Sequence, residues 1–250
     1  FARLLLNAFE NLLGRDFCET ATLVEIAAEP GAGLFEKEKG IFKDTLTLRL
    51  GDELKLPERA VVFANEWLDA QPFHSFKMGE DGWTELGVDV SQDTLKEVTL
   101  PCPTPAGARF IAEKLADKDA PIGYRLDISL EAPQLLEKMA AQNFKGAFVT
   151  ADYGRTFSEL LEMCPEGTAR AFFKHQVSGK LLNNPGTQDL TCDVCWDDLS
   201  TILNDCGFSD IQIERQERFF MRHALPAVSK IIEQSPVTSP EKRALTELLH

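Results

Sequence analysis

The sequence lacks any apolar run that approaches the length of a membrane span. A transmembrane helix needs about 20 consecutive apolar residues, and no segment of the 250-residue chain comes near that length. No signal peptide is visible either. We therefore expect no membrane partner.

Basic side chains are scarce relative to acidic ones. The chain has 26 Lys and Arg against 40 Asp and Glu, a formal net charge of −14, and no local basic stripe. A nucleic-acid backbone would be repelled by such a surface, so we expect no nucleic-acid partner. The length is nevertheless sufficient to bury a parallel sheet under covering helices, as one large domain or one domain with a lobe.

Cysteine is too sparse for a disulfide scaffold, since the six cysteines are scattered along the chain. A reducing cytoplasm is the expected location. Cys192 and Cys195 do form a Cys-x-x-Cys pair, but zinc would need a second ligand pair, and the four histidines are neither paired nor suitably spaced. We therefore expect no metal site and interpret the pair as two small side chains along an extended segment. Zinc or redox chemistry at this pair is the alternative, which metal analysis of the purified protein would test.

Hydrophobic spacing predicts helices and strands that alternate along the chain. Within 1–17, apolar positions at helical spacing stop at Gly14 and predict a helix, and alternation of β-branched residues within 45–54 predicts a strand that ends at Gly51 and Asp52. The four prolines of 91–121 indicate an irregular insertion. The other expected elements are a short strand, a small-residue turn and a possible helix start within 21–35, a strand and turn over 59–70, strands at 123–130 and 145–154 and from about 210, a hairpin around 79–82, helices at 131–143 and 197–206, and a terminal helix with Ser239 as its N-cap and Pro240 at its first position.

This alternation is typical of an α/β fold with a mostly parallel, doubly wound sheet. Ligands of such sheets bind outside the carboxyl ends of the strands. The residues expected there are Glu25 with the turn 27–33, Asp52, Asn65, Glu66, Asp69, Asp127, Asp152 and Tyr153. Nearly all are acidic or small, which favours a ligand with a cationic centre and no phosphate.

The motifs at these strand ends resemble those of a known family. They are "ANEWLDAQPFHSF", "DGWTELGV", "VTADYG", "GTARAFFKHQV" and "NNPGTQDLTCDV", in that order. Together they are similar to the MidA-type class I S-adenosylmethionine-dependent methyltransferases, a family that includes the mitochondrial protein arginine methyltransferase needed for complex I assembly. The similarity runs from about residue 21 to 220.

The resemblance implies a Rossmann-like methyltransferase sheet, mostly parallel with helices on both faces, plus an inserted lobe and a C-terminal helix. It divides the chain into an N-terminal helix with the first part of the core (1–76), an inserted hairpin or lobe (77–121), the second part of the core (122–222) and a helical tail (223–250).

The resemblance also implies S-adenosylmethionine as cofactor. The family's turn is Glu-x-Gly-x-Gly-x-Gly, and two of its first three glycines are replaced in this chain, while the region of strand two is shortened so that Asp52 stands where an acid would hold the ribose. The implied cofactor-binding residues are Glu25, Ala27 and Glu29 (the two replaced positions), Gly31, Gly33, Asp52 and Asn65.

For arginine methylation, the acids have a clear task. A guanidinium is protonated and a poor nucleophile, so carboxylates must bind it, orient one nitrogen and accept a proton. Glu66 and Asp69 are the candidates for guanidinium binding and His175 for a secondary base. Asp152, Tyr153 and Arg170 are the implied substrate-binding residues.

Two readings of function remain open at this stage. The first is a methyltransferase that acts on a protein substrate, plausibly at arginine, with a homodimer as a possible assembly. The second is a catalytically degenerate protein of the same fold that acts as a binding or assembly factor, since two turn glycines are missing and fold does not fix function.

Overall fold

The computed structural model describes residues 1–250 apart from 29–30, 39, 92–93, 175, 237–238 and 249–250. The chain forms two compact units, and each is built from separated stretches of sequence. Unit 1 comprises Phe1–Asn65, Met139–Ala151 and Asp210–His250, and unit 2 comprises Glu66–Lys138 and Asp152–Ser209.

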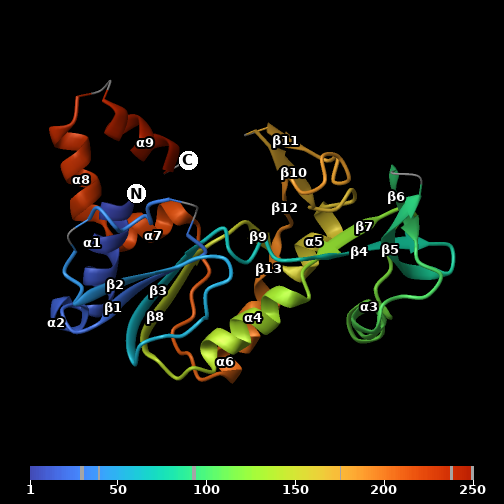
Figure 1. The fold of residues 1–250 in the computed structure, drawn as a ribbon, viewed down its shortest axis with the longest axis horizontal. Helices are drawn as coiled ribbons and strands as arrows, with labels where there is room; N and C mark the ends of the chain where they lie inside the picture. The colour runs from blue at the N-terminus through green and yellow to red at the C-terminus, as the bar shows by residue number, and fades with distance from the viewer. Residues whose placement is uncertain (29–30, 39, 92–93, 175, 237–238, 249–250) are drawn as a thin grey trace. The chain divides into compact units, whose positions relative to one another are not determined.

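A four-stranded parallel sheet is the centre of unit 1 (Figure 1). Its order is β2 (Asp44–Leu48), β1 (Thr22–Ile26), β3 (Arg59–Asn65), β8 (Lys145–Ala151). Apolar side chains of β1 and β3 are buried on both faces, because successive residues of a strand point to opposite sides and Ala60 to Ala64 are all buried. The predicted α/β fold with a parallel sheet is therefore confirmed.

Helices from both ends of the chain pack on one face of this sheet. Leu5 and Phe9 of α1 (Ala2–Leu13) share a buried cluster with Phe63 of β3 and Phe220 of α7 (Gln216–His223). Gly14, with φ +80, ends α1 as the sequence predicts, and the short α2 (Arg15–Cys18) follows it. Two more helices, α8 (Leu225–Gln234) and α9 (Pro240–Leu248), complete this cluster. Lys242 N donates to Ser239 Oγ, as expected for the predicted N-cap.

Unit 2 contains an antiparallel sheet whose extent the sequence did not predict. Its order is β6 (Thr94–Thr99), β5 (Gly82–Ser91), β4 (His74–Gly79), β7 (Arg125–Ile128). The predicted hairpin around 79–82 is present, but the expectation that 91–121 is irregular is wrong. That stretch holds β6, then α3 (Pro105–Phe110), which runs directly into a π-helical segment, Ile111–Leu115.

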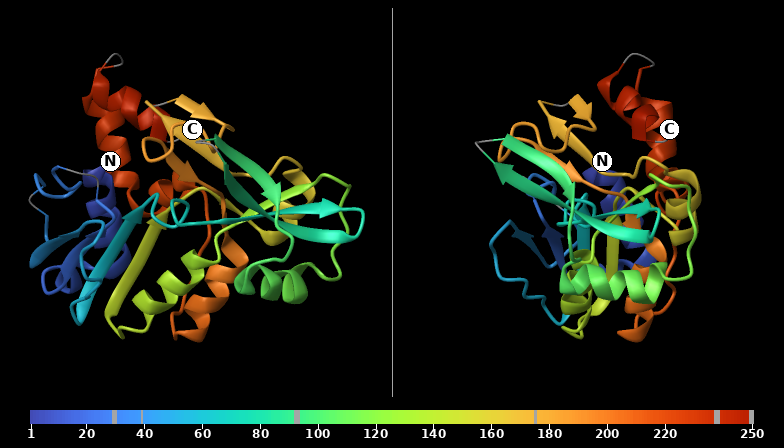
Figure 2. Two further views of the ribbon diagram at one scale, coloured as in Figure 1. Left: turned by 45° about the vertical axis from the view of Figure 1, so that its right-hand side comes forward. Right: turned by 90° about the vertical axis from the view of Figure 1, so that its right-hand side faces the viewer.

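Helix α3 and its π-helical extension lie beside the antiparallel sheet (Figure 2). Phe110 stacks on Phe76 of β4 with ring centroids 5.2 Å apart. Around this pair, Trp83, Tyr124 and Leu126 are buried in the core of unit 2. The lobe is therefore a packed structure, and the β5–β6 hairpin extends from it.

The remaining elements of unit 2 are short and carry the candidate site. They are β9 (Gly154–Arg155), α5 (Phe157–Met163), β10 (Arg170–Phe173), β11 (Gln176–Ser178), β12 (Asp189–Thr191), β13 (Val194–Cys195) and α6 (Trp196–Asp205). Helix α4 (Glu131–Ala140) confirms the helix predicted over 131–143. The strand predicted from about 210 is wrong: residues 210–215 form no strand, and Ile213 is 55 % exposed because no neighbouring strand pairs with this segment.

Among the helices of the described residues, none combines the length and hydrophobicity that a membrane span requires.

Candidate functional site

The turn after β1 in unit 1 adopts a backbone that favours glycine. Ala27 has φ +58 and Gly31 has φ +114, both in the left-handed region. Glu29 lies outside the described residues. Position 27 therefore has a left-handed backbone, which glycine adopts more readily than the alanine that occupies it.

Glu25 lies against this turn with half of its carboxylate free. The residue is only 7 % exposed, and Oε1 accepts a hydrogen bond from Leu34 N at 2.9 Å. Oε2 is buried and has no hydrogen-bond partner among the described residues. A Cβ added at Gly33 would stand 2.6 Å from this oxygen, so glycine leaves the space that the carboxylate occupies. A buried, unpaired acceptor is costly unless a ligand satisfies it.

Replacing Ala27 by glycine tests this reading of the turn. We expect Ala27→Gly to raise the free energy of unfolding by about 0.5–1 kcal/mol, because relief of the left-handed alanine outweighs the greater freedom of glycine in the unfolded chain. Urea denaturation measures the change. Ala28→Gly is the matched control and should lower the free energy of unfolding by a similar amount. If both variants lose stability alike, the backbone of Ala27 is not strained and the interpretation of the turn is wrong.

Asp52 is connected to the same turn through Arg49. Asp52 Oδ2 accepts from Arg49 N at 2.8 Å, and Arg49 Nη2 donates to Gly31 O at 2.6 Å. Since β2 is the parallel neighbour of β1, the ends of the two strands meet at one edge of the sheet. Arg49 is a contact that the sequence reasoning missed, because an arginine at the end of a strand carries no motif of its own.

Unit 2 gathers the predicted acids around the loop that follows β3. Asn65, the last residue of β3, is exposed, and Glu66 after it is exposed with φ +48. Asp152 Oδ1 accepts hydrogen bonds from Leu68 N at 2.9 Å and Asp69 N at 3.1 Å. Asp152 was predicted to bind substrate, and in the structure it holds the backbone that carries Asp69.

Asp69 has the most perturbed environment of these acids. It is 1 % exposed, and its Oδ1 is buried with no partner in the part of the chain that the structure describes. Burial, followed by the negative charges of Asp152 and Glu66, raises the pKa of Asp69 to about 7, and Arg170 opposes the rise. A carboxyl group with a pKa near neutrality suits proton transfer.

The other predicted substrate residues lie near this acid. Tyr153 is 57 % exposed, and the Arg170 guanidinium carbon is 5.0 Å from its ring centroid. Arg170 Nη2 donates to Asp193 Oδ1 at 2.6 Å. His175 lies outside the described residues, so its role stays a prediction.

Asp193 and Arg155 belong to the same network and were missed from the sequence. Asp193 is 4 % exposed, and its Oδ2 accepts from Arg155 Nε at 2.9 Å. The available signal was the acid inside "CDVC". Both cysteines are buried, which raises the pKa of Cys192 far above its usual range and that of Cys195 to about 12. Burial thus opposes the thiolate that redox or metal chemistry would need, and the described residues contain no cluster suited to a metal ion.

Comparison with known proteins identifies related chains. A family model described as "Putative S-adenosyl-L-methionine-dependent methyltransferase" matches residues 43–213. Two relatives are the protein arginine methyltransferases NDUFAF7 of Rattus norvegicus, 32 % identical over 161 residues, and of Homo sapiens, 28 % identical over 182 residues. The matches cover 62 % and 70 % of this chain but only 34 % and 38 % of those proteins, so the chain spans little more than a third of their length.

A solved structure shares the fold. A COG1565 superfamily member from Burkholderia thailandensis, bound to S-adenosyl-homocysteine, superposes with a TM-score of 0.82 at 22 % identity, and the match covers 100 % of this chain and 72 % of that one.

The relatives from rat and human are both named as mitochondrial. That finding overturns the cytoplasmic location expected from the cysteines, because a reducing environment inferred from scattered cysteines does not distinguish one compartment from another.

Proposed function

The chain belongs to the S-adenosyl-L-methionine-dependent methyltransferase family, and on this premise we propose that it transfers a methyl group from S-adenosylmethionine to an arginine side chain of a protein. The observation that carries the proposal is Asp69, a buried carboxyl group with a pKa of about 7 and one oxygen that has no hydrogen-bond partner among the described residues. The names of the relatives support a protein substrate, an arginine target and a mitochondrial setting.

The geometry of the turn in unit 1 supports the proposal that it holds the cofactor. S-adenosylmethionine would supply an electrophilic methyl group and a cationic centre. Glu25 would offer to a donor of the cofactor its Oε2, which has no partner in the described part of the chain, and the backbone at Ala27, Gly31 and Gly33 would allow close approach. Asp52, exposed at the end of β2, would accept hydrogen bonds from the ribose hydroxyls, and Asn65 is the further candidate.

The acids of unit 2 would bind the guanidinium and take its proton. Glu66 is an exposed loop residue with a strained backbone, so its carboxylate is available to a cation. Asp69 would accept the proton that the attacking nitrogen releases, since about half of it is ionised at pH 7. Asp152 positions Asp69 through two backbone hydrogen bonds. Tyr153 and Arg170 would line the path of the substrate, with His175 as a candidate second base.

Calorimetric titration with S-adenosylmethionine and S-adenosylhomocysteine tests the proposal. We expect both to bind with Kd between about 1 μM and 1 mM. Gly33→Ala should weaken binding at least about tenfold, because its Cβ would displace the Glu25 carboxylate or Thr47. Gly179→Ala is the control, since a Cβ there meets nothing within 4 Å.

The two readings of function give different results in that titration. If neither molecule binds at millimolar concentration, the enzyme proposal fails. The degenerate binding or assembly protein then becomes the better account of the fold.

A further inference from the structure

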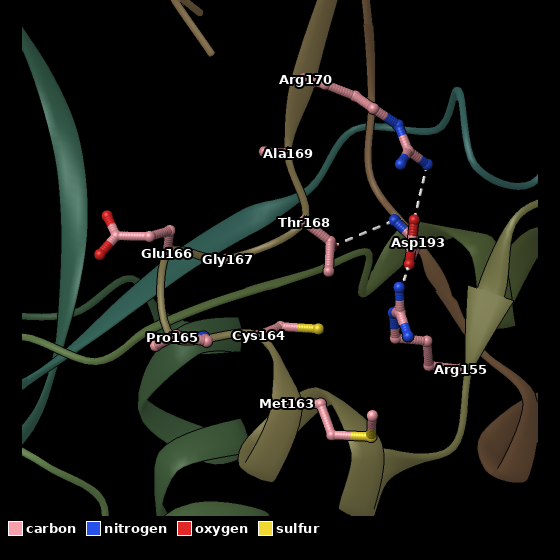
Figure 3. Close-up of a pocket in the computed structure, with 10 residues that line it drawn as sticks. All are labelled: Arg155, Met163, Cys164, Pro165, Glu166, Gly167, Thr168, Ala169, Arg170 and Asp193. Atoms are coloured by element: carbon pink, nitrogen blue, oxygen red, sulfur yellow. Dashed lines mark hydrogen bonds and ion pairs between the residues drawn. The ribbon is translucent and has the colours of Figure 1, made fainter.

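A cavity of about 340 Å³ lies within unit 2, between the end of α5 and the start of β10 (Figure 3). Cys164, Pro165 and Ala169 form part of its wall. Arg155 and Arg170 reach toward each other from β9 and β10, with the carboxylate of Asp193 between them. The volume is at the lower end of the range typical of ligand pockets, so a side chain or small ligand fits better than a large cofactor.

The charges of this cavity are unevenly placed around its lining. Two guanidinium groups share one buried carboxylate, with Arg155 Nε 2.9 Å from Asp193 Oδ2 and Arg170 Nη2 2.6 Å from Oδ1. Glu166, the other acid of the lining, directs its carboxylate away from this pair (Figure 3). Glu166 balances the lining in formal charge, but the Arg155–Asp193–Arg170 group by itself has one excess positive charge, in a chain whose net charge is −14.

Donors also remain free at the cavity. Arg155 uses its Nε for Asp193, and no hydrogen bond joins its two Nη groups to another described residue. An arginine presents five N–H donors in a planar fork that matches a carboxylate. The side chain of Arg155 is 41 % exposed, so this fork is accessible from solvent.

The backbone amides of the wall favour a carboxylate over a phosphate. Phosphate sites usually present several free backbone N–H groups. Here Gly167 N donates to Cys164 O at 2.9 Å, while Thr168 N and Ala169 N both donate to Asp127 Oδ2, at 3.0 and 2.9 Å. The guanidinium fork is thus the main donor that the cavity offers.

The cavity is joined to the acid at the centre of the proposed reaction. Cys192 N, next to Asp193 in sequence, donates to Asp69 O at 3.0 Å. Arg170 and Asp193 are both close enough to Asp69 to alter its charge. A ligand in the cavity would therefore be held near a guanidinium that binds at Glu66 and Asp69.

We propose that the Arg155–Arg170 cavity binds the carboxylate of an acidic residue of the protein substrate, near the arginine that is methylated. This rests on the proposed function, because it assigns the second anchor of the same substrate. The chain then selects arginines that have an Asp or Glu within a few residues, and the positive charge of the cavity discriminates against arginines in basic segments.

Side-chain NMR of the full chain tests the cavity directly. Glutarate serves as the probe, and the Nε–H signals of Arg155 and Arg170 are the readout. We expect saturable shifts with a Kd below about 10 mM, at least about fivefold weaker binding in Arg155→Gln, and an intermediate loss in Arg155→Lys, which keeps the charge but not the fork. Arg109→Gln, an exposed arginine outside the cavity, should bind as the unmodified chain does. Neutral glutaramide should cause no shift.

Three outcomes would overturn the assignment of the cavity: no saturable shift with glutarate, phosphate binding as tightly as glutarate, or unchanged affinity in both Arg155 variants. The Lys variant keeps a cation beside Asp193, so the test survives if the Gln variant fails to fold. S-adenosylhomocysteine binding, measured in parallel, separates the two proposals: glutarate binding without cofactor binding would defeat the methyltransferase and leave a carboxylate site.

A peptide library tests the link to the substrate. Decapeptides with one fixed arginine and random flanks are selected on the unmodified chain and on Arg155→Gln. We expect Asp or Glu to be enriched at one spacing from the arginine, and the enrichment to disappear in the variant. Equal selection by the two proteins would defeat the acidic-substrate proposal even if glutarate binds.

Discussion

Asp69→Asn is expected to abolish methyl transfer while making the protein more stable. Loss of a general base typically costs about 10²–10⁴-fold in rate, and S-adenosylhomocysteine affinity should stay within about threefold because Asp69 is not part of the cofactor turn. Transfer of labelled methyl groups to mitochondrial proteins, with methylarginine quantified after hydrolysis, measures the activity. In the unmodified chain, kcat/KM should rise with pH through about 7 as Asp69 ionises.

The stability effect of the same substitution depends on pH. The folded-state pKa of Asp69 lies above the usual value of 3.8, so the folded chain holds the proton more tightly than the unfolded chain does. The stability that this provides is complete below about pH 4 and is lost as pH rises through 7, a change of up to about 4 kcal/mol. Asn cannot ionise, so the variant should gain about 2–4 kcal/mol at pH 8 and almost nothing at pH 4.

A control variant separates this local effect from general charge removal. Asp81 is exposed in the β4–β5 turn, and Asp81→Asn should change neither the rate nor the pH dependence of stability. If Asp69→Asn keeps full activity with the substrate, Asp69 is not the base. A stability gain that does not depend on pH would contradict the ionisation argument.

Gly146→Ala is expected to destabilise unit 1 by at least about 3 kcal/mol. Gly146 has φ +148 in β8 and pairs with Ala60 of β3. A Cβ at this position would clash with Ala60 O, which is backbone and cannot move without breaking the β3–β8 pairing. Urea denaturation should show a clearly lower midpoint.

The adjacent residue provides the matched control for that variant. Ala147→Gly makes the reverse change one position along β8 and should cost only about 1 kcal/mol. Equal losses from the two variants would show that strand propensity, and not the contact with Ala60, decides stability at this position.

The sequence predicted the parallel sheet because its signals are local. Val61 to Ala64 form a continuous apolar run, as buried parallel strands require, and Gly14 and Pro240 mark helix ends by their own backbone restrictions. The structure of the inserted lobe was harder to predict from the sequence. Its prolines suggested irregular chain, yet Pro105 is at the start of α3 behind Thr104, whose hydroxyl accepts from Gly107 N at 3.0 Å. That combination was a usable helix-start signal.

Strand pairing explains the other errors of the sequence-based prediction, because local sequence does not determine which strands pair. The segment 210–215 alternates as a strand would, but it finds no partner. The strand predicted over 123–130 exists as β7, and only the structure reveals that it pairs antiparallel with β4. At the candidate site, motifs located Glu66 and Asp69, whereas Arg155 and Asp193 act through contacts across 38 residues of sequence that no spacing rule predicts.

The division of unit 1 into three stretches has a consequence for synthesis of the chain. Leu5 and Phe9 of α1 bury against Phe220, Val228 and Leu245, more than 200 residues further on. Contacts so distant in sequence form late, because the intervening chain must be made and its closure entropy overcome. While the ribosome translates unit 2, Phe220, Val228 and Leu245 are not yet available to cover α1, so chaperones that hold exposed hydrophobic helices should bind α1 in the nascent chain and release it only after the segment 210–250 has emerged.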